Sequence, residues 1–154
     1  MKKLVLFFAA AAIMCACSSE PKFLAYRGLS MGLTTQQFID SLIARGFAVD
    51  SAHSDSGHTA VMKNPELTYI TIVAFDNDTL KAVQDNYTAT YNDSTRQLWQ
   101  ELRDNFEKEL GTWPNCPTLG EDHKIAKFET DGGFVTITLK NTYTPTLQVL
   151  YEQK

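Results

Sequence analysis

Two stretches of the chain place apolar residues at helical spacing behind a polar cap. In LTTQQFIDSLIARGF, Thr34 stands three residues before Gln37, and in STRQLWQELRDNFEKELG, Ser94 stands three residues before Gln97. This spacing is that of a capping box, in which the side chains of both residues satisfy free backbone amides. Each stretch ends at a glycine, which favours helix termination. The predicted helices span residues 34–46 and 94–111.

Strand-like runs follow each helix, and turn signals such as NPE, DND and TDGG separate them. The predicted strands are 59–63, 67–75, 80–91, 124–130, 134–141 and 147–152. Each half of the chain thus has the pattern of a helix followed by a three-stranded meander. The pattern predicts an α+β fold in which two helix–β-meander repeats form one antiparallel sheet, with both helices packed on one face.

The predicted strands differ in how they alternate. Val135, Ile137 and Leu139 are expected to point inward, and Thr136 and Thr138 outward. The run LTYITIVAF is instead apolar at successive positions. It is either a central strand or a strand whose outer face meets another surface.

The N-terminus has the pattern of a targeting segment rather than of a folded element. Lys2 and Lys3 precede an apolar run over residues 4–14. This run is too short to cross a bilayer, which requires about 20 apolar residues. It matches the apolar region of a secretory signal.

The end of this run, IMCACSSE, resembles the lipobox of bacterial lipoproteins. In that family a small residue precedes the cysteine that carries the lipid. Ala16 precedes Cys17, whereas the bulky Met14 precedes Cys15. The resemblance therefore implies that Cys17 is the lipidated residue and that Cys15 leaves with the signal.

The same resemblance implies a location and a division of the chain. A diacylglyceryl thioether and an acylated amino group (palmitate or a similar chain) would hold the protein on the membrane, and Ser18 directly after the cysteine favours the outer membrane over the inner one. The periplasmic and surface faces both remain open. The expected division is a signal peptide at 1–16, a lipid-bearing tether at 17–22 and a single α+β domain at 23–154, with possible halves at 23–92 and 93–154.

The charge balance of the mature chain restricts its partners. Removal of residues 1–16 leaves 138 residues (154 − 16), with 12 basic residues (14 − 2) and 18 acidic ones, for a formal charge of −6. No basic cluster is present to neutralise phosphates, so a nucleic-acid partner is not expected. No phosphate-binding loop, dinucleotide turn or serine elbow is present either, and we expect no cofactor.

Two segments contain side chains with catalytic or metal-binding potential. In HSDSGH, the residues His53, Asp55 and His58 are plausible metal ligands, but the surrounding Ser and Gly favour a solvated loop. In GTWPNCPTLGEDH, Cys116 and His123 suggest a cysteine nucleophile, although nothing in the sequence orients them.

That second loop has a structural interpretation as well. Trp113 and two prolines indicate that it folds back on an apolar patch, with Cys116 buried or idle. Trp113 and Cys116 are also the candidate residues of a partner-binding loop, because long loops are often functional. For Tyr69, Tyr87 and Tyr91, ordinary cross-strand packing is favoured over a ligand-binding face.

A second resemblance concerns the first helix. GLTTQQFIDSLIARGF is similar to the helix opening of small tandem-repeat β-lactamase-inhibitor proteins and of small lipoproteins of the outer-membrane assembly machinery, with Leu33 in place of Met and Phe38 in place of Val. The resemblance implies a helix-then-meander fold and a binding role, and it assigns no functional residue.

The sequence therefore predicts a membrane-tethered, non-enzymatic binding or assembly module of the bacterial cell envelope, with an envelope protein or glycan as partner. The alternatives are an envelope enzyme centred on Cys116 and an inhibitor of a secreted enzyme that acts through the 111–123 loop. The sequence does not indicate an oligomeric state.

Overall fold

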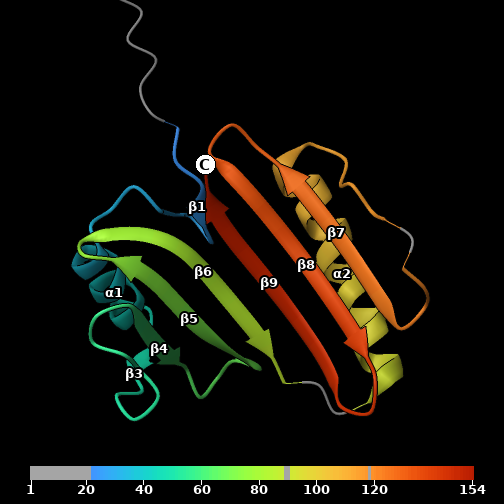
Figure 1. Ribbon diagram of the computed structural model, residues 1–154, viewed down its shortest axis with the longest axis horizontal. Helices are drawn as coiled ribbons and strands as arrows, with labels where there is room; N and C mark the ends of the chain where they lie inside the picture. Colours follow the sequence, from blue (N-terminus) through green and yellow to red (C-terminus); the bar gives the residue numbers. More distant parts are fainter. Residues whose placement is uncertain (1–21, 89–90, 118) are drawn as a thin grey trace, which may run out of the picture.

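A computed structural model describes residues 22–88, 91–117 and 119–154. Within them a seven-stranded antiparallel sheet has the order β3-β4-β5-β6-β9-β8-β7, and β1 pairs with β2 in a separate hairpin (Figure 1). The strands are β1 Ala25–Tyr26, β2 Leu29–Ser30, β3 Ala48–Val49, β4 Thr59–Lys63, β5 Tyr69–Asp76, β6 Thr79–Tyr87, β7 His123–Glu129, β8 Gly133–Asn141 and β9 Pro145–Gln153. The helices are α1 Thr35–Ala44 and α2 Asn92–Leu110.

The predicted α+β fold of two helix–β-meander repeats is wrong. The structure is mostly β, with 43% strand and 22% helix, and it does not consist of helix–β repeats. α1 has 10 residues and α2 has 19, and the short strands β1, β2 and β3 have no counterpart after α2. Local patterns suggested two equal units because capped helices and hairpins each depend on neighbouring residues alone. They carry no information on the hairpin inserted before α1.

The two predicted helix starts have different outcomes. At α1 the capping box is confirmed, since the amide of Gln37 donates to Thr34 Oγ1 at 3.3 Å and the amide of Thr34 donates to Gln37 Oε1 at 3.2 Å. At α2 the box at Ser94 is wrong, because the helix begins earlier, with Tyr91 as an N-cap that makes no side-chain hydrogen bond. The predicted glycine stop is confirmed at Gly111, where φ is 63°.

The helix-facing side of the sheet forms the core. In Figure 1 both helices lie behind the sheet, α1 behind its β4–β6 part and α2 behind its β7–β9 part. Val135, Ile137 and Leu139 are buried on this side, as predicted. The β1–β2 hairpin adds Tyr26, whose ring lies 5.9 Å from Phe38 of α1 and 5.0 Å from Tyr151 of β9. The hairpin thus joins the parts of the core under the two helices.

A buried polar cluster holds the hairpin on the sheet. The Asp85 side chain is fully buried on β6, and its carboxylate accepts hydrogen bonds from the hydroxyls of Tyr26 at 2.9 Å and Thr71 at 2.7 Å. Arg27 donates to the other carboxylate oxygen at 2.9 Å and to the Tyr87 hydroxyl at 2.9 Å. Burial is the main cause that raises the pKa of Tyr26 well above its usual range and the pKa of Tyr87 to about 12. A buried carboxylate is tolerated here because its oxygens are satisfied by charged and polar donors.

Candidate functional site

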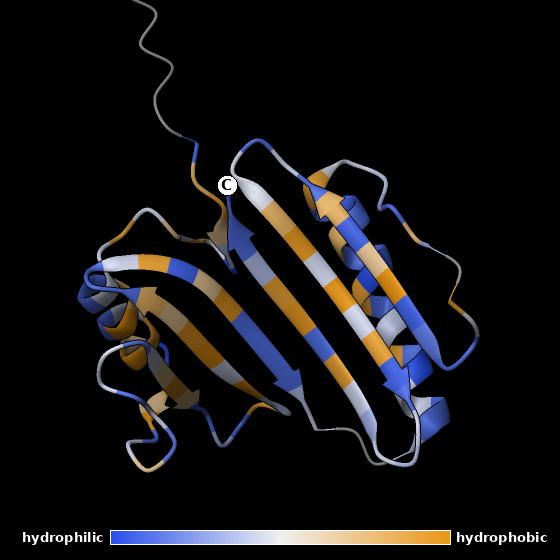
Figure 2. Ribbon diagram, viewed as in Figure 1, coloured by the Kyte–Doolittle hydropathy of each residue, from blue (hydrophilic) through white to orange (hydrophobic). Residues whose placement is uncertain are grey.

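The side of the sheet opposite the helices forms an open face. In Figure 1 the viewer looks onto this face, and Figure 2 shows hydropathy alternating along β8 and β9 while β5 stays largely hydrophobic. β5 lies between β4 and β6 inside the sheet, so the interpretation of LTYITIVAF as an interior strand is confirmed. Its residues Ile70, Ile72 and Ala74 are half-buried on the open face.

Strand register places eight uncharged side chains side by side on this face. One row joins Ile70, Asn86, Gln148 and Thr138, and the next joins Ile72, Gln84, Leu150 and Thr136. We call these eight residues the uncharged strip. Strand spacing gives the strip dimensions of roughly 20 Å across the strands by 10 Å along them.

The strip has a defined polar centre with charged residues outside it. The amide of Gln84 donates to Asn86 Oδ1 at 2.7 Å, which orders the two side chains. All eight members are half-buried, because neighbouring strands shield them while their outer sides remain accessible. Lys63 on β4 pairs with Ile70 at one side of the strip, and Lys127 on β7 pairs with Thr136 at the other side. The strip is therefore an uncharged surface with one lysine at each of two diagonally opposite corners and the apolar Val61 and Ile125 at the other two.

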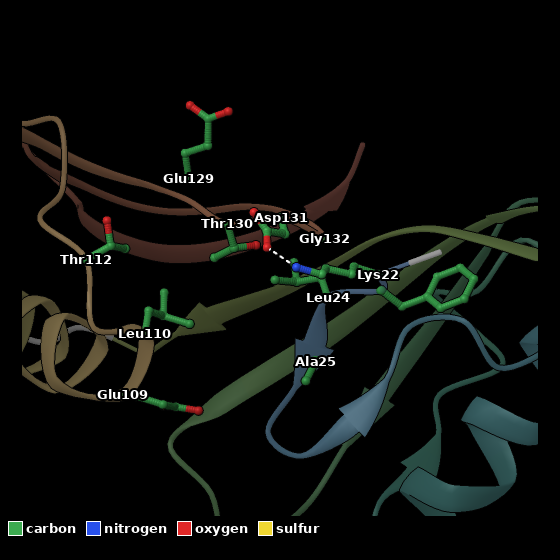
Figure 3. A pocket seen from close by; sticks show the side chains of 11 residues that line it. Lys22, Leu24, Ala25, Glu109, Leu110, Thr112, Glu129, Thr130, Asp131 and Gly132 are labelled. Atoms are coloured by element: carbon green, nitrogen blue, oxygen red, sulfur yellow. Dashed lines mark hydrogen bonds and ion pairs between the residues drawn. The ribbon is translucent and has the colours of Figure 1, made fainter. Parts of the chain in front are cut away.

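A second feature is an open cleft of about 630 Å³ where the chain enters the fold (Figure 3). The N-terminal segment, the end of α2 and the β7–β8 turn line it. Lys22 forms an ion pair with Asp131 across the cleft. Gly132 permits the close approach, since a Cβ atom there would lie 2.5 Å from the Leu24 amide nitrogen. Residues 22–24 are therefore docked against the turn.

The predicted partner-binding loop differs from its expected conformation. The loop was expected to fold back on an apolar patch, but Trp113 is 82% exposed and takes no part in such a contact. Cys116 is also exposed and free, so of the two expected states, buried or idle, the buried one is wrong. The loop instead runs beside β7, where the amides and carbonyls of Asn115 and Lys127 exchange hydrogen bonds of 2.8 and 2.9 Å. This pairing protects an edge strand.

Cys116 and His123 line one cavity of about 260 Å³ together with Trp99. Among the described residues no hydrogen bond joins the thiol to the imidazole, so the geometry of an activated nucleophile is not present. Cys17 lies outside the described residues.

The remaining candidates have structural roles. His53 pairs with Asp50 at 2.8 Å, and Asp55 accepts from the Gly57 amide at 3.1 Å within its own turn. Over residues 22–88, 91–117 and 119–154 no group of three or more His, Cys, Asp or Glu side chains is placed to hold a metal ion.

The three tyrosines are divided between the sheet and the surface. Tyr69 and Tyr87 pack against each other across strands at 5.0 Å, as predicted. Tyr91 is 73% exposed and lies beyond the end of β6, so the predicted strand 80–91 is too long.

Sequence reasoning missed the uncharged strip and the Asp85 cluster. The signal for the strip was present, since Gln84 and Asn86, and likewise Thr136 and Thr138, stand two apart in predicted strands. What the sequence lacks is the β6–β9 pairing, which brings the two halves of the strip together. Asp85 stands in the polar run QDN, where no local pattern indicates that it is buried.

No protein-family model, curated protein or solved structure matches the chain. Within the part of the chain that the structure describes, none of the helices has the length and hydrophobicity needed to cross a membrane.

Proposed function

We propose that this protein is a non-enzymatic binding module of the bacterial cell envelope, tethered to the outer membrane through lipid on Cys17. Its ligand is an uncharged, extended glycan chain that lies across the uncharged strip. The single observation that supports this proposal best is the strip itself. It consists of amide, hydroxyl and aliphatic side chains in two straight rows on an uncovered sheet.

The chemistry of the strip favours a sugar polymer. The amide groups of Gln84, Asn86 and Gln148 both donate and accept hydrogen bonds, as the hydroxyl groups of a glycan require. Ile72 and Leu150 supply aliphatic surface beside them for the C–H faces of sugar rings. A neutral ligand also avoids the cost of removing a charge from water.

The size of the strip favours an extended chain over a folded protein. An area of roughly 20 by 10 Å is well below the ~800 Å² that each partner buries in a standard protein interface. A linear polymer makes its contacts along a narrow track and needs no broad surface. Each row meets one lysine where it leaves the four strands of the strip, Lys63 beside Ile70 and Lys127 beside Thr136.

The test is calorimetric titration of the mature lipidated protein, held in nanodiscs, with a neutral linear glucan and with neutral polysaccharide extracted from a Gram-negative outer membrane. We expect at least one of these probes to bind. Gln84→Lys places a charge in the middle of the strip and should weaken that binding about tenfold, equivalent to about 1.4 kcal/mol. Lys140→Gln, on the same face but outside the strip, should leave it unchanged.

Absence of binding by both probes would contradict the glycan proposal. A photo-crosslinker at Thr138 supplies the complementary result in cells. If it captures a protein while neither polysaccharide binds, the partner of the open face is a protein. Equal binding by the wild type and by Gln84→Lys would move the glycan site away from the strip.

A further inference from the structure

The chain enters the folded domain at one end of the sheet. Lys22 pairs with Asp131 of the β7–β8 turn, and Phe23 lies against Gly32, where a Cβ atom would come within 2.5 Å of the ring. The C-terminus lies at the same end, since the Lys154 amide donates to the Gly132 carbonyl at 3.3 Å. We call this region the tether end. Figure 1 shows the chain entering beside the C-terminus.

The tether leaves little room between this end and a membrane. Cys17 precedes Lys22 by five residues (22 − 17). Even a fully extended chain of that length spans at most about 18 Å. A lipid on Cys17 therefore keeps the tether end within reach of the headgroup layer.

Trp113 lies at this same end. The preceding residue, Thr112, lines the cleft that Lys22 also lines (Figure 3), and Asn115 is paired to Lys127 by two backbone hydrogen bonds. The tryptophan is thus fixed on both sides, and its side chain is nevertheless 82% exposed. Phe23 adds a second aromatic ring at 49% exposure.

Tryptophan is the side chain that membrane–water interfaces favour, because its ring is apolar and its N–H can still find a hydrogen-bond partner. We infer that the tether end of the folded domain rests on the lipid surface, with Trp113 inserted into the headgroup layer. This inference rests on the proposed lipid anchor at Cys17. It adds that the domain has a fixed orientation on the membrane instead of swinging freely on its tether.

The charged residues at the tether end indicate that Trp113, and not a cluster of cations, makes the contact with lipid. Lys22 pairs with Asp131 and Lys154 pairs with Glu129, so these two cations are neutralised within the protein. Glu109 also lines the cleft. This end is therefore not a basic patch that would need anionic lipid, and the contact should form on zwitterionic lipid as well.

The opposite end of the sheet supplies a matched control. β8 runs from Gly133 at the tether end to Asn141, which places the β8–β9 turn roughly 27 Å away. Tyr143 in that turn is fully exposed. A tryptophan at position 143 is therefore as accessible as Trp113 but remote from the membrane in the inferred orientation.

The experiment uses the mature lipidated protein in phosphatidylcholine vesicles with or without brominated acyl chains, which quench tryptophan on contact. We expect brominated vesicles to reduce the emission of the wild type. Trp113→Phe should remove that reduction, because the remaining Trp99 is only 5% exposed inside the domain. The double variant Trp113→Phe, Tyr143→Trp should also show no quenching.

The outcomes separate this inference from the proposed function. Intact mass and vesicle flotation first report whether Cys17 carries lipid; a protein without lipid overturns both. A lipidated, vesicle-bound protein whose Trp113 is not quenched overturns the inference alone. Equal quenching at positions 113 and 143 overturns it too, because a freely swinging domain would bring both ends to the lipid.

Discussion

Arg27, in the turn between β1 and β2, donates to the carboxylate of Asp85 in the middle of β6, with Nη2 and Oδ2 2.9 Å apart. Arg27 has a φ of 47°, a left-handed conformation that side chains other than glycine adopt at a cost. Its guanidinium also lies 4.6 Å from the centre of the Tyr69 ring. The favourable free energy of this ion pair offsets the cost of the left-handed turn, and the pair fixes the β1–β2 hairpin on the sheet.

Removal of the carboxylate should therefore destabilise the whole fold. Asp85→Ala leaves the guanidinium of Arg27 and the hydroxyl of Tyr26 without their shared acceptor, and we expect a loss of about 3 kcal/mol in the free energy of unfolding. Urea denaturation measures it. Asp78→Ala, an exposed aspartate in the β5–β6 turn, should change stability by less than about 0.5 kcal/mol. Similar losses in the two variants would contradict the role of the cluster.

The raised pKa of Tyr87 predicts a loss of stability at alkaline pH. Its pKa is about 12 in the folded protein against 10.0 for a free tyrosine, so the unfolded state loses its proton first as pH rises. The contribution of Tyr87 to the free energy of unfolding is fully present below pH 10 and declines between pH 10 and about 12. Urea midpoints at pH 9 and pH 11 should differ less in Tyr87→Phe than in the wild type. If the two urea midpoints differ as much in Tyr87→Phe as in the wild type, Tyr87 does not cause the loss of stability at alkaline pH.

The docking of residues 22–24 against the β7–β8 turn predicts different effects of two glycine substitutions on amide hydrogen exchange. Gly132→Ala places a Cβ 2.5 Å from the Leu24 amide nitrogen, whereas the nearest atom at Gly57 would be 3.7 Å away. We expect Gly132→Ala to displace residues 22–26 and to increase their amide hydrogen exchange. Gly57→Ala should leave that exchange unchanged. Equal protection in both variants would mean that the segment is not held by the β7–β8 turn.

The lipid attachment site is tested by two cysteine substitutions and radiolabelled fatty acid. Cys17→Ala should abolish labelling, because the modified thiol is lost. Cys15→Ala should retain it, because the small residue Ala16 still precedes Cys17. The reverse result would move the lipid to Cys15, and an unlabelled wild type would remove the tether from the proposed function.

The reactivity of the exposed Cys116 thiol distinguishes a binding module from an enzyme. Cys116 should react completely with a thiol reagent in the folded protein, at a rate comparable to that of a small-molecule thiol. A much faster reaction would favour the alternative of an enzyme centred on Cys116, since activated cysteines react as thiolates. Cys116→Ser should leave glycan binding by the strip unchanged.

Features that depend on neighbours in the chain could be predicted from the sequence. The capping box at Thr34 and Gln37, the stop at Gly111 and the alternation over β8 are interactions or periodicities of a few residues, and each was predicted correctly. The start of α2 was predicted incorrectly. Ser94 has the spacing of a capping box with Gln97, but the helix already begins at Asn92. Local spacing shows that a cap is possible, and the surrounding fold decides whether it is used.

Features that join distant segments were decided only by the tertiary structure. Asp85 is buried because Tyr26 and Arg27, about 60 residues earlier, supply donors that compensate for its lost hydration. The uncharged strip exists because β6 pairs with β9, and the loop that carries Trp113 lies beside β7 because Asn115 pairs with Lys127. By itself the sequence determined the local elements and the lipobox-like segment. Which residues share a face or an end of the sheet depends on long-range pairing, whose energy is distributed over many contacts and leaves no local pattern.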